Sequence, residues 1–238
     1  MPVRRAVKAL APVLALLAQP AAAQAYQCRA PSAAPSVPAI SRDGPVRQRP
    51  VARYTLALSW SPEFCRSREN SARNAFQCSG SGGRFGFVVH GLWPEARGSD
   101  FPQWCPTRRS PSPALVRQHL CMTPDAALLA HEWARHGACM VPRPETYFGV
   151  ARTLWNALRW PDYDRLSRQQ GLTAGEVRQA FVDANPGYRA DAVGLVLTDR
   201  GWLREMRLCL GRNFRAVACP RGQFGPADST NVRIWRGL

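Results

Sequence analysis

Eight cysteines constrain the fold of this 238-residue chain more than any other feature of its sequence. They are spread along the chain at Cys28, Cys65, Cys78, Cys105, Cys121, Cys139, Cys209 and Cys219. An even number of cysteines in an exported protein is typical of thiols that pair as disulfides. The spacing does not resemble paired C-x-x-C zinc knuckles, so we expect disulfides and no metal site. Spacing alone does not select among the many possible pairings.

The first 25 residues have the pattern of a secretory signal peptide. Arg4, Arg5 and Lys8 form a basic start, residues 9–17 are a short apolar run, and Ala23-Gln24-Ala25 fits a cleavage site. The alternative is a membrane anchor, but the apolar run is too short to span a bilayer. No later stretch is apolar for long enough to cross a membrane. We therefore predict cleavage after Ala25 and a mature protein located in the periplasm or outside the cell.

The chain is strongly basic. Its formal net charge is +16 at pH 7, and removing the three basic residues of the signal leaves a mature chain of +13. Such a charge attracts RNA, DNA, acidic polysaccharides or anionic membranes without choosing among them. Lys8 is the only lysine, so an arginine-biased composition explains part of the charge.

The order of the expected elements predicts the fold class. Residues 26–52 are rich in Ala, Pro, Ser and Arg without periodicity, which predicts a flexible leader before a single domain at 53–238. We expect strands over 54–60, 84–90, 192–197, 203–210 and 214–217, and helices over 114–120, 125–136, 145–158 and 173–184. Thr173 and Glu176 have the spacing of a capping box. This order favours an α+β fold, a largely antiparallel sheet flanked by helices and stabilised by disulfides.

The first motif that carries chemistry is FVVHGLWP, residues 87–94. We expect a strand to deliver His90 to its end, where Gly91 lets the backbone turn. Trp93 follows three residues later. Taken alone, a histidine at a strand end is often only a hydrogen-bonded structural residue.

The second motif is HEWARHGAC, residues 131–139, on an expected helix. Glu132 and His136 are four residues apart and share a face, while His131 and Arg135 form a neighbouring stripe. The motif therefore gathers two imidazoles, a carboxylate and a guanidinium. Of the four histidines in the chain, only His119 lies outside the two motifs.

Two other chemistries fit these residues poorly. A zinc protease needs histidines four apart on one helical face, whereas His131 and His136 are five apart and Arg135 would repel a metal cation. No Gly-x-Ser-x-Gly elbow indicates a serine nucleophile. Two histidines with a carboxylate and a cation instead suit metal-free cleavage of RNA, whose 2′-hydroxyl is a built-in nucleophile. DNA lacks that hydroxyl, so we expect no DNA cleavage.

Together the two motifs resemble the active-site segments of the ribonuclease T2 family. The resemblance extends from Arg53 to about Cys219, and RYTLALSWSPEFC is similar to the family's first strand and cysteine. It implies that His136 is the general base and His90 the general acid, that His131 holds the phosphate, and that Glu132 assists in the transition state. Arg135 stands where the family has lysine. It keeps the positive charge and the ability to grip phosphate, so we expect retained activity.

The resemblance also implies the residues that bind the base. Trp93 is similar to the family's base-stacking residue, with ordinary core packing as the alternative. Glu95 stands where some relatives carry an acid that contacts adenine. Phe101 or Trp104 completes the pocket. Stacking tolerates any base, so low base specificity is expected.

The family pattern implies a set of disulfides. It pairs Cys139 with the loop after the first motif, with Cys105 as the preferred partner and Cys121 as the rival. The other pairs that it implies are Cys65–Cys78, Cys209–Cys219 and Cys28–Cys121.

These observations favour a monomeric endoribonuclease for single-stranded RNA, without cofactor or metal, that acts through a 2′,3′-cyclic phosphate to leave 3′-phosphate ends. The competing hypothesis is a secreted cationic protein that coats nucleic acid or envelope polyanions and has a vestigial site. It rests on charge alone, and the intact set of His90, His131, Glu132 and His136 argues against it.

Overall fold

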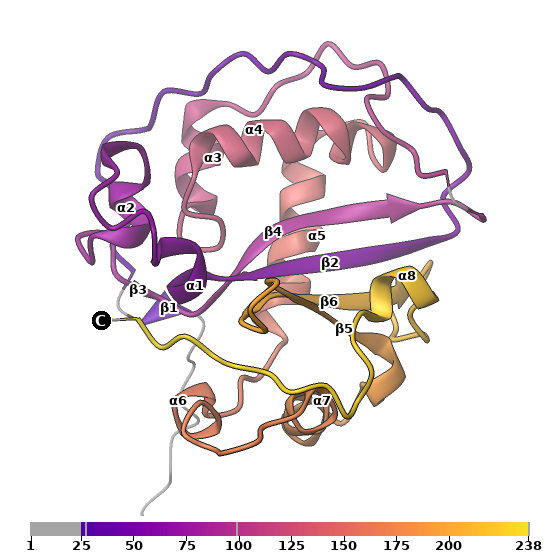
Figure 1. The fold of residues 1–238 in the computed structure, drawn as a ribbon. Coiled ribbons are helices and arrows are strands. Elements are labelled where there is room, and N and C mark those ends of the chain that lie inside the picture. The colour runs from indigo at the N-terminus through magenta and orange to yellow at the C-terminus, as the bar shows by residue number, and fades with distance from the viewer. Residues whose placement is uncertain (1–24, 27, 99, 238) are drawn as a thin grey trace, which may run out of the picture.

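A four-stranded antiparallel sheet forms the centre of the molecule (Figure 1). The computed structural model describes residues 25–26, 28–98 and 100–237. The strands lie in the order β4 (Phe87–Glu95), β2 (Arg53–Trp60), β6 (Leu203–Gly211) and β5 (Val193–Leu197). A separate pair consists of β1 (Ala25–Tyr26) and β3 (Arg84–Phe85). Helices flank the central sheet, which confirms the predicted α+β class.

The four predicted helices are present, and their ends lie within two residues of the predicted ones. They are α3 (Pro113–His119), α4 (Ala126–Arg135), α5 (Pro144–Asn156) and α7 (Ala174–Ala184). Four further helices of four or five residues are α1 (Ser61–Cys65), α2 (Ala75–Cys78), α6 (Tyr163–Leu166) and α8 (Arg221–Phe224). The sequence did not predict them because one helical turn has no apolar periodicity to detect.

Side-chain caps explain where the longer helices begin. The Asp125 carboxylate accepts hydrogen bonds from the first backbone N–H groups of α4, and the Ser112 hydroxyl accepts one at the start of α3. The predicted capping box of Thr173 and Glu176 is confirmed at the start of α7. Because Asp125 fixes the first turn of α4, it also fixes the phase of the helix that carries the second motif.

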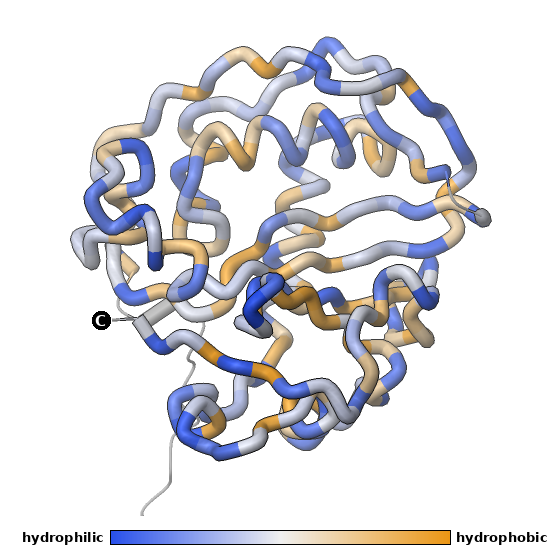
Figure 2. The backbone as a smooth tube through the Cα atoms, viewed as in Figure 1, coloured by the Kyte–Doolittle hydropathy of each residue, from blue (hydrophilic) through white to orange (hydrophobic). Residues whose placement is uncertain are grey.

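The two faces of the central sheet differ in character. Leu56, Leu58 and Leu208 lie on one face, are fully buried, and belong to the same apolar core as Phe148 of α5 and Phe181 of α7. Residues between them in the β2–β6 register, such as Thr55 opposite Cys209 and Ser59 opposite Glu205, point to the other face. Figure 2 shows apolar stretches along the strands and the inner helices, with hydrophilic stretches on the outside. The second face is therefore free to carry polar chemistry.

Two strand predictions were wrong in detail. Residues 84–90 were expected to end a strand at His90, but β4 continues to Glu95. Residues 214–217 were expected to form a strand, but only Ala216 pairs, in an isolated bridge with Leu210. Phe214 has a φ of 59°, which breaks the extended conformation at the start of that segment.

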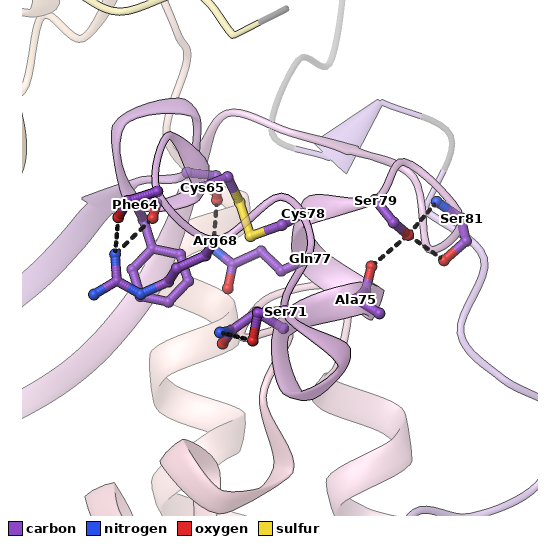
Figure 3. Close-up of a disulfide and its surroundings, with 12 residues drawn as sticks. Phe64, Cys65, Arg68, Ser71, Ala75, Gln77, Cys78, Ser79 and Ser81 are labelled. Atoms are coloured by element: carbon purple, nitrogen blue, oxygen red, sulfur yellow. Dashed lines mark hydrogen bonds between the residues drawn. A yellow bond between two sulfur atoms is a disulfide. The ribbon is translucent and has the colours of Figure 1, made fainter.

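The four disulfides pair as the family resemblance implied. They are Cys28–Cys121, Cys65–Cys78, Cys105–Cys139 and Cys209–Cys219. Figure 3 shows that Cys65–Cys78 ties α1 to α2, which lie side by side at this corner of the molecule. Beside it, the Arg68 guanidinium lies over the Phe64 ring and donates to the Phe64 carbonyl oxygen.

Residues 28–52, expected as a flexible leader, run over the outside of the domain as the indigo trace of Figure 1. We call this segment the N-terminal strap. It is held by the Cys28–Cys121 disulfide, by two backbone hydrogen bonds between Arg47 and Gln103, and by the Asp43 carboxylate. These fixed points, which composition does not reveal, make the strap part of the domain surface.

The predicted signal peptide lies outside the described residues up to residue 24. Within the described part of the chain, no helix is long and apolar enough to cross a membrane.

One buried arginine fixes the C-terminal segment. The Arg178 side chain of α7 is fully buried and donates to the backbone oxygens of Val193, Phe224 and Pro226 and to Asp228. It thereby holds α8, whose Gln223 donates to Glu95 at the end of β4. The packing of this segment thus reaches the polar face of the sheet.

We predict that Arg178→Met lowers the free energy of unfolding by about 3 kcal/mol or more, because it leaves several buried carbonyl oxygens without donors. Denaturant titration measures this loss. Arg168→Met is the matched control, because Arg168 pairs with Asp164 at the exposed surface and its loss should cost less than about 1 kcal/mol. Equal effects of the two substitutions would contradict the prediction.

Candidate active site

A β-bulge places His90. In the β2–β4 pairing, Ala57 lies opposite Gly91 and Leu58 lies opposite Val89, so His90 is an extra residue without a partner. Bulges bend a strand locally and redirect the side chain of the extra residue. The His90 imidazole is about one third exposed, and its Nδ1 lies 2.8 Å from Glu205 Oε2 of β6. The bulge therefore presents the His90 side chain to the site, which the sequence analysis had expected of a strand end.

Glu132 of α4 is the buried acid of the site. Its Oε2 accepts a hydrogen bond of 2.8 Å from the Trp93 indole, and its Oε1 lies 3.7 Å from His90 Nε2. Burial raises the pKa of Glu132 to about 7, although His90 and Trp93 oppose that rise. A side chain at position 91 would displace the Glu132 carboxylate, because a Cβ there would lie 1.9 Å from Glu132 Oε2.

His136 caps the C-terminal end of α4 and is nearly buried. Its ring lies 5.8 Å from the Trp93 ring and 6.3 Å from the Phe101 ring, measured between centroids. Its Nδ1 is buried and has no hydrogen-bond partner among the described residues, which leaves Nε2 as the nitrogen able to reach a ligand. Burial, with further contributions from Arg135 and the other two site histidines, lowers the pKa of His136 to about 3.

His90 and His136 have opposite pKa shifts. Burial alone would lower the pKa of His90, but the hydrogen bond with Glu205 and the charge of Glu132 outweigh it and raise that pKa. His136 lacks such an acid partner, and its pKa falls. Between the two pKa values, His90 carries a proton and His136 does not. An acid and a base that differ in this way form a general acid–base pair.

His131 and Arg135 lie at the edge of the site. His131 is half-buried, packs its ring edge-on against Trp104, and has a pKa lowered by burial and by Arg135. Arg135, expected to grip phosphate, instead donates to the Asp43 carboxylate of the strap at 3.0 and 3.2 Å and to Gln103 at 3.2 Å. Its guanidinium is therefore already paired, an arrangement that the helical spacing did not reveal.

The residues expected to bind the base fall into two groups. Trp93 lies beside both His90 and His136 rather than in the core, and Phe101 faces His136. Trp104 is buried beneath the strap, where its indole N–H donates to Asp43, so of the two alternatives Phe101 is the one available for stacking. Glu95 accepts hydrogen bonds from Thr55 and Gln223, and burial raises its pKa.

His119, the histidine outside both motifs, is a core residue. It is buried against Phe148, and burial lowers its pKa to about 4.

Two site residues were not predicted from the sequence. Glu205 and Arg207 of β6 lie on the polar face of the sheet, where Arg207 Nε donates to Glu205 Oε1 at 2.8 Å. The Arg207 guanidinium also lies 5.4 Å from the centre of the Trp93 ring. A carboxylate between two arginines in a strand was the available signal, because such a group needs a partner when it is buried.

A cleft of about 830 Å³ opens beside His90 and His131. It is bounded by the α1–α2 segment, the first turns of α4, Ile40 of the strap, and β6. Its acids are engaged: Glu63 pairs with Arg66, Asp125 caps α4, and Glu205 pairs with His90. By contrast, Arg73 and Arg204 are exposed and form no ion pair with any described residue. The cleft is therefore positively charged next to the histidines.

No group of three or more His, Cys, Asp or Glu side chains among the described residues is arranged to hold a metal ion.

The sequence model of the Ribonuclease T2 family matches residues 52–180, which include both motifs. The chain belongs to the ribonuclease T2 family. A protein of Aeromonas hydrophila named "Ribonuclease" is 40% identical over 174 residues, covering 70% of this chain and 75% of that protein. A "Probable ribonuclease" of Haemophilus influenzae is 41% identical over 132 residues, covering 51% of this chain and 48% of that protein. This chain thus spans about half the length of the Haemophilus relative.

Solved structures of ribonucleases share the fold. Trichomaglin, described as a novel S-like ribonuclease, superposes with a TM-score of 0.61 at 20% identity over 78% of this chain and 98% of that one. RNase NT, solved in complex with 5′-AMP, gives a TM-score of 0.58 at 17% identity over 78% of this chain and 98% of that one. The α+β architecture is therefore shared with ribonucleases whose sequences are 20% identical or less to this one.

We predict that Gly91→Ala displaces Glu132 and reduces RNA cleavage by at least about tenfold, because a buried overlap of this kind forces backbone shifts. Activity and unfolding free energy should be measured together. Gly149→Ala is the control, because a Cβ at Gly149 in α5 meets nothing within 4 Å and alanine favours a helix. Wild-type activity in Gly91→Ala would contradict the placement of Glu132.

Proposed function

We propose that this protein is an endoribonuclease that cleaves single-stranded RNA by transesterification, without a metal, through a 2′,3′-cyclic phosphate. The observation that carries the proposal is the pair of histidines, His90 and His136, that both lie beside Trp93 and have opposite pKa shifts. RNA supplies its own nucleophile, so an acid and a base suffice for strand cleavage. DNA lacks the 2′-hydroxyl and is not cleaved.

In the first step, neutral His136 removes the proton of the 2′-hydroxyl, whose oxygen attacks the adjacent phosphorus. Protonated His90 donates its proton to the departing 5′-oxygen, and the P–O5′ bond breaks. In the second step the roles reverse: His90 takes a proton from water, which opens the cyclic phosphate, and His136 protonates the 2′-oxygen. The products are a 3′-phosphate end and a free 5′-hydroxyl, and both histidines regain their starting protonation states.

The remaining site residues stabilise charge on the phosphate. His131 and a protonated Glu132 donate to its oxygens, and the raised pKa of Glu132 supports this role near neutral pH. Arg135 lies close enough to lower the pKa of both His131 and His136, so its positive charge acts on the site although Asp43 holds its guanidinium.

The base and the strand are held by different surfaces. Trp93 and Phe101 stack on the base, with Glu95 beyond them, and stacking of this kind favours low base specificity. RNase NT, which has the same fold, has been solved in complex with 5′-AMP, which supports a nucleotide site here. Arg73 and Arg204 of the cleft attract the phosphates of the flanking strand. Four disulfides and the signal-like N-terminus support action in the periplasm or outside the cell.

We predict that His90→Ala and His136→Ala each reduce cleavage of single-stranded RNA by about 10²–10⁴-fold, the usual contribution of a general acid or base. Circular dichroism should show that both variants remain folded. His119→Gln is the control, because His119 is a core histidine outside both motifs. A cationic binding protein would instead bind RNA and DNA alike and cleave neither, and full activity of His136→Ala would overturn the proposal.

A further inference from the structure

Glu205 is buried against the general acid and has no place in the mechanism derived above. Its carboxylate is 7% exposed and uses both oxygens: Oε2 lies 2.8 Å from His90 Nδ1, and Oε1 accepts from Arg207 Nε at 2.8 Å. The contact joins β4 to β6 across the intervening strand β2, and residues 90 and 205 are 115 positions apart. Glu205 and Arg207, both on β6, thus hold the imidazole of His90 on β4.

We propose that Glu205 is the positioning residue of the general acid: it accepts the Nδ1–H of His90 and turns Nε2 toward the scissile phosphate, while Arg207 holds Glu205 in place. This inference rests on the proposed function. It assigns a residue to the reaction that lies outside both active-site motifs. Glu205 does not touch the substrate and acts only through His90.

The hydrogen bond controls which nitrogen of His90 can react. When Nδ1 carries the proton shared with Glu205, the neutral form of the ring leaves Nε2 free to accept a proton, and the charged form donates from Nε2. The same ring therefore serves as acid in the first step and as base in the second without rotating. Glu132 Oε1 lies 3.7 Å from Nε2, on the reacting side of the ring.

Charge is the second contribution of Glu205. The groups that act electrostatically on or with His90 are Glu132, His131 and His136 from α4 and its C-terminal end, and Glu205 and Arg207 from β6. Burial and Arg207 favour the neutral imidazole, whereas the two carboxylates favour the imidazolium. With Glu132 buried and readily protonated, Glu205 is the acid that keeps His90 charged at the pH of reaction.

The test separates this role from a purely structural one. Glu205→Gln keeps the shape and a hydrogen-bond acceptor but removes the charge. In the pH profile of kcat/KM, the acidic limb reports His136, and the alkaline limb reports His90 together with the protonated Glu132, from which the NMR titration below separates it. We expect Glu205→Gln to move the alkaline limb to lower pH by about one unit or more and to leave the acidic limb in place. A structural residue would reduce activity equally at every pH.

The matched control is Glu63→Gln, which removes a carboxylate from the same cleft that pairs with Arg66 rather than with His90. Its alkaline limb should stay where it is in the wild type. Arg207→Gln should move that limb to higher pH, because the guanidinium opposes the charge on His90. An unmoved alkaline limb in Glu205→Gln, or the same shift in Glu63→Gln, would overturn the proposal.

A titration by NMR tests the inference without using activity. The chain has only four histidines, so the His90 ring signals are identified by comparison with a His90→Gln sample. We expect the His90 pKa to fall by about one unit or more in Glu205→Gln. An unchanged His90 pKa would refute the role of Glu205 even in an active ribonuclease. If wild-type protein fails to cleave RNA while this pKa shift appears, the proposed function fails and the pairing stands.

Discussion

Burial of the Glu132 carboxylate against Gly91 joins the two halves of the site. The carboxylate occupies the space of a missing Cβ on β4 and accepts the Trp93 indole N–H, so α4 lies directly against the edge strand of the sheet. That contact brings His136 beside Trp93 and places the acid near His90. It also raises the Glu132 pKa, because water is excluded where the helix meets the strand. This one packing contact therefore sets both the positions of the site residues and the pKa of Glu132.

The disulfides and the strap hold the surroundings of that contact. Cys105–Cys139 ties the loop that carries Phe101 to the end of α4, just beyond His136. Asp43 of the strap joins Arg135 and Trp104, so the segment before the first sheet strand covers the outer side of the same helix. Such crosslinks stabilise long loops that have little core of their own. The disulfide and the Asp43 contacts thus hold the loops around the site in place.

The sequence predicted the fold class, four helices and the histidines because these depend on local patterns. The capping box of Thr173 and Glu176 and helical periodicity marked the helices, and rare histidines marked the site. The bulge at His90 was missed because it arises from pairing with β2, which no local pattern records. Glu205 and Asp43 were missed for the same reason, since each meets its partner from a distant part of the chain. The spacing of Arg135 predicted its place on the helix but not its partner.

We propose that two histidines cleave RNA without a metal, and one digestion tests this directly. Single-stranded RNA is incubated with the oxidised protein in excess EDTA, and the new ends are identified by mass spectrometry. We expect undiminished cleavage, with 2′,3′-cyclic phosphate ends that convert to 3′-phosphates. Loss of cleavage in EDTA, or new 5′-phosphate ends, would contradict it.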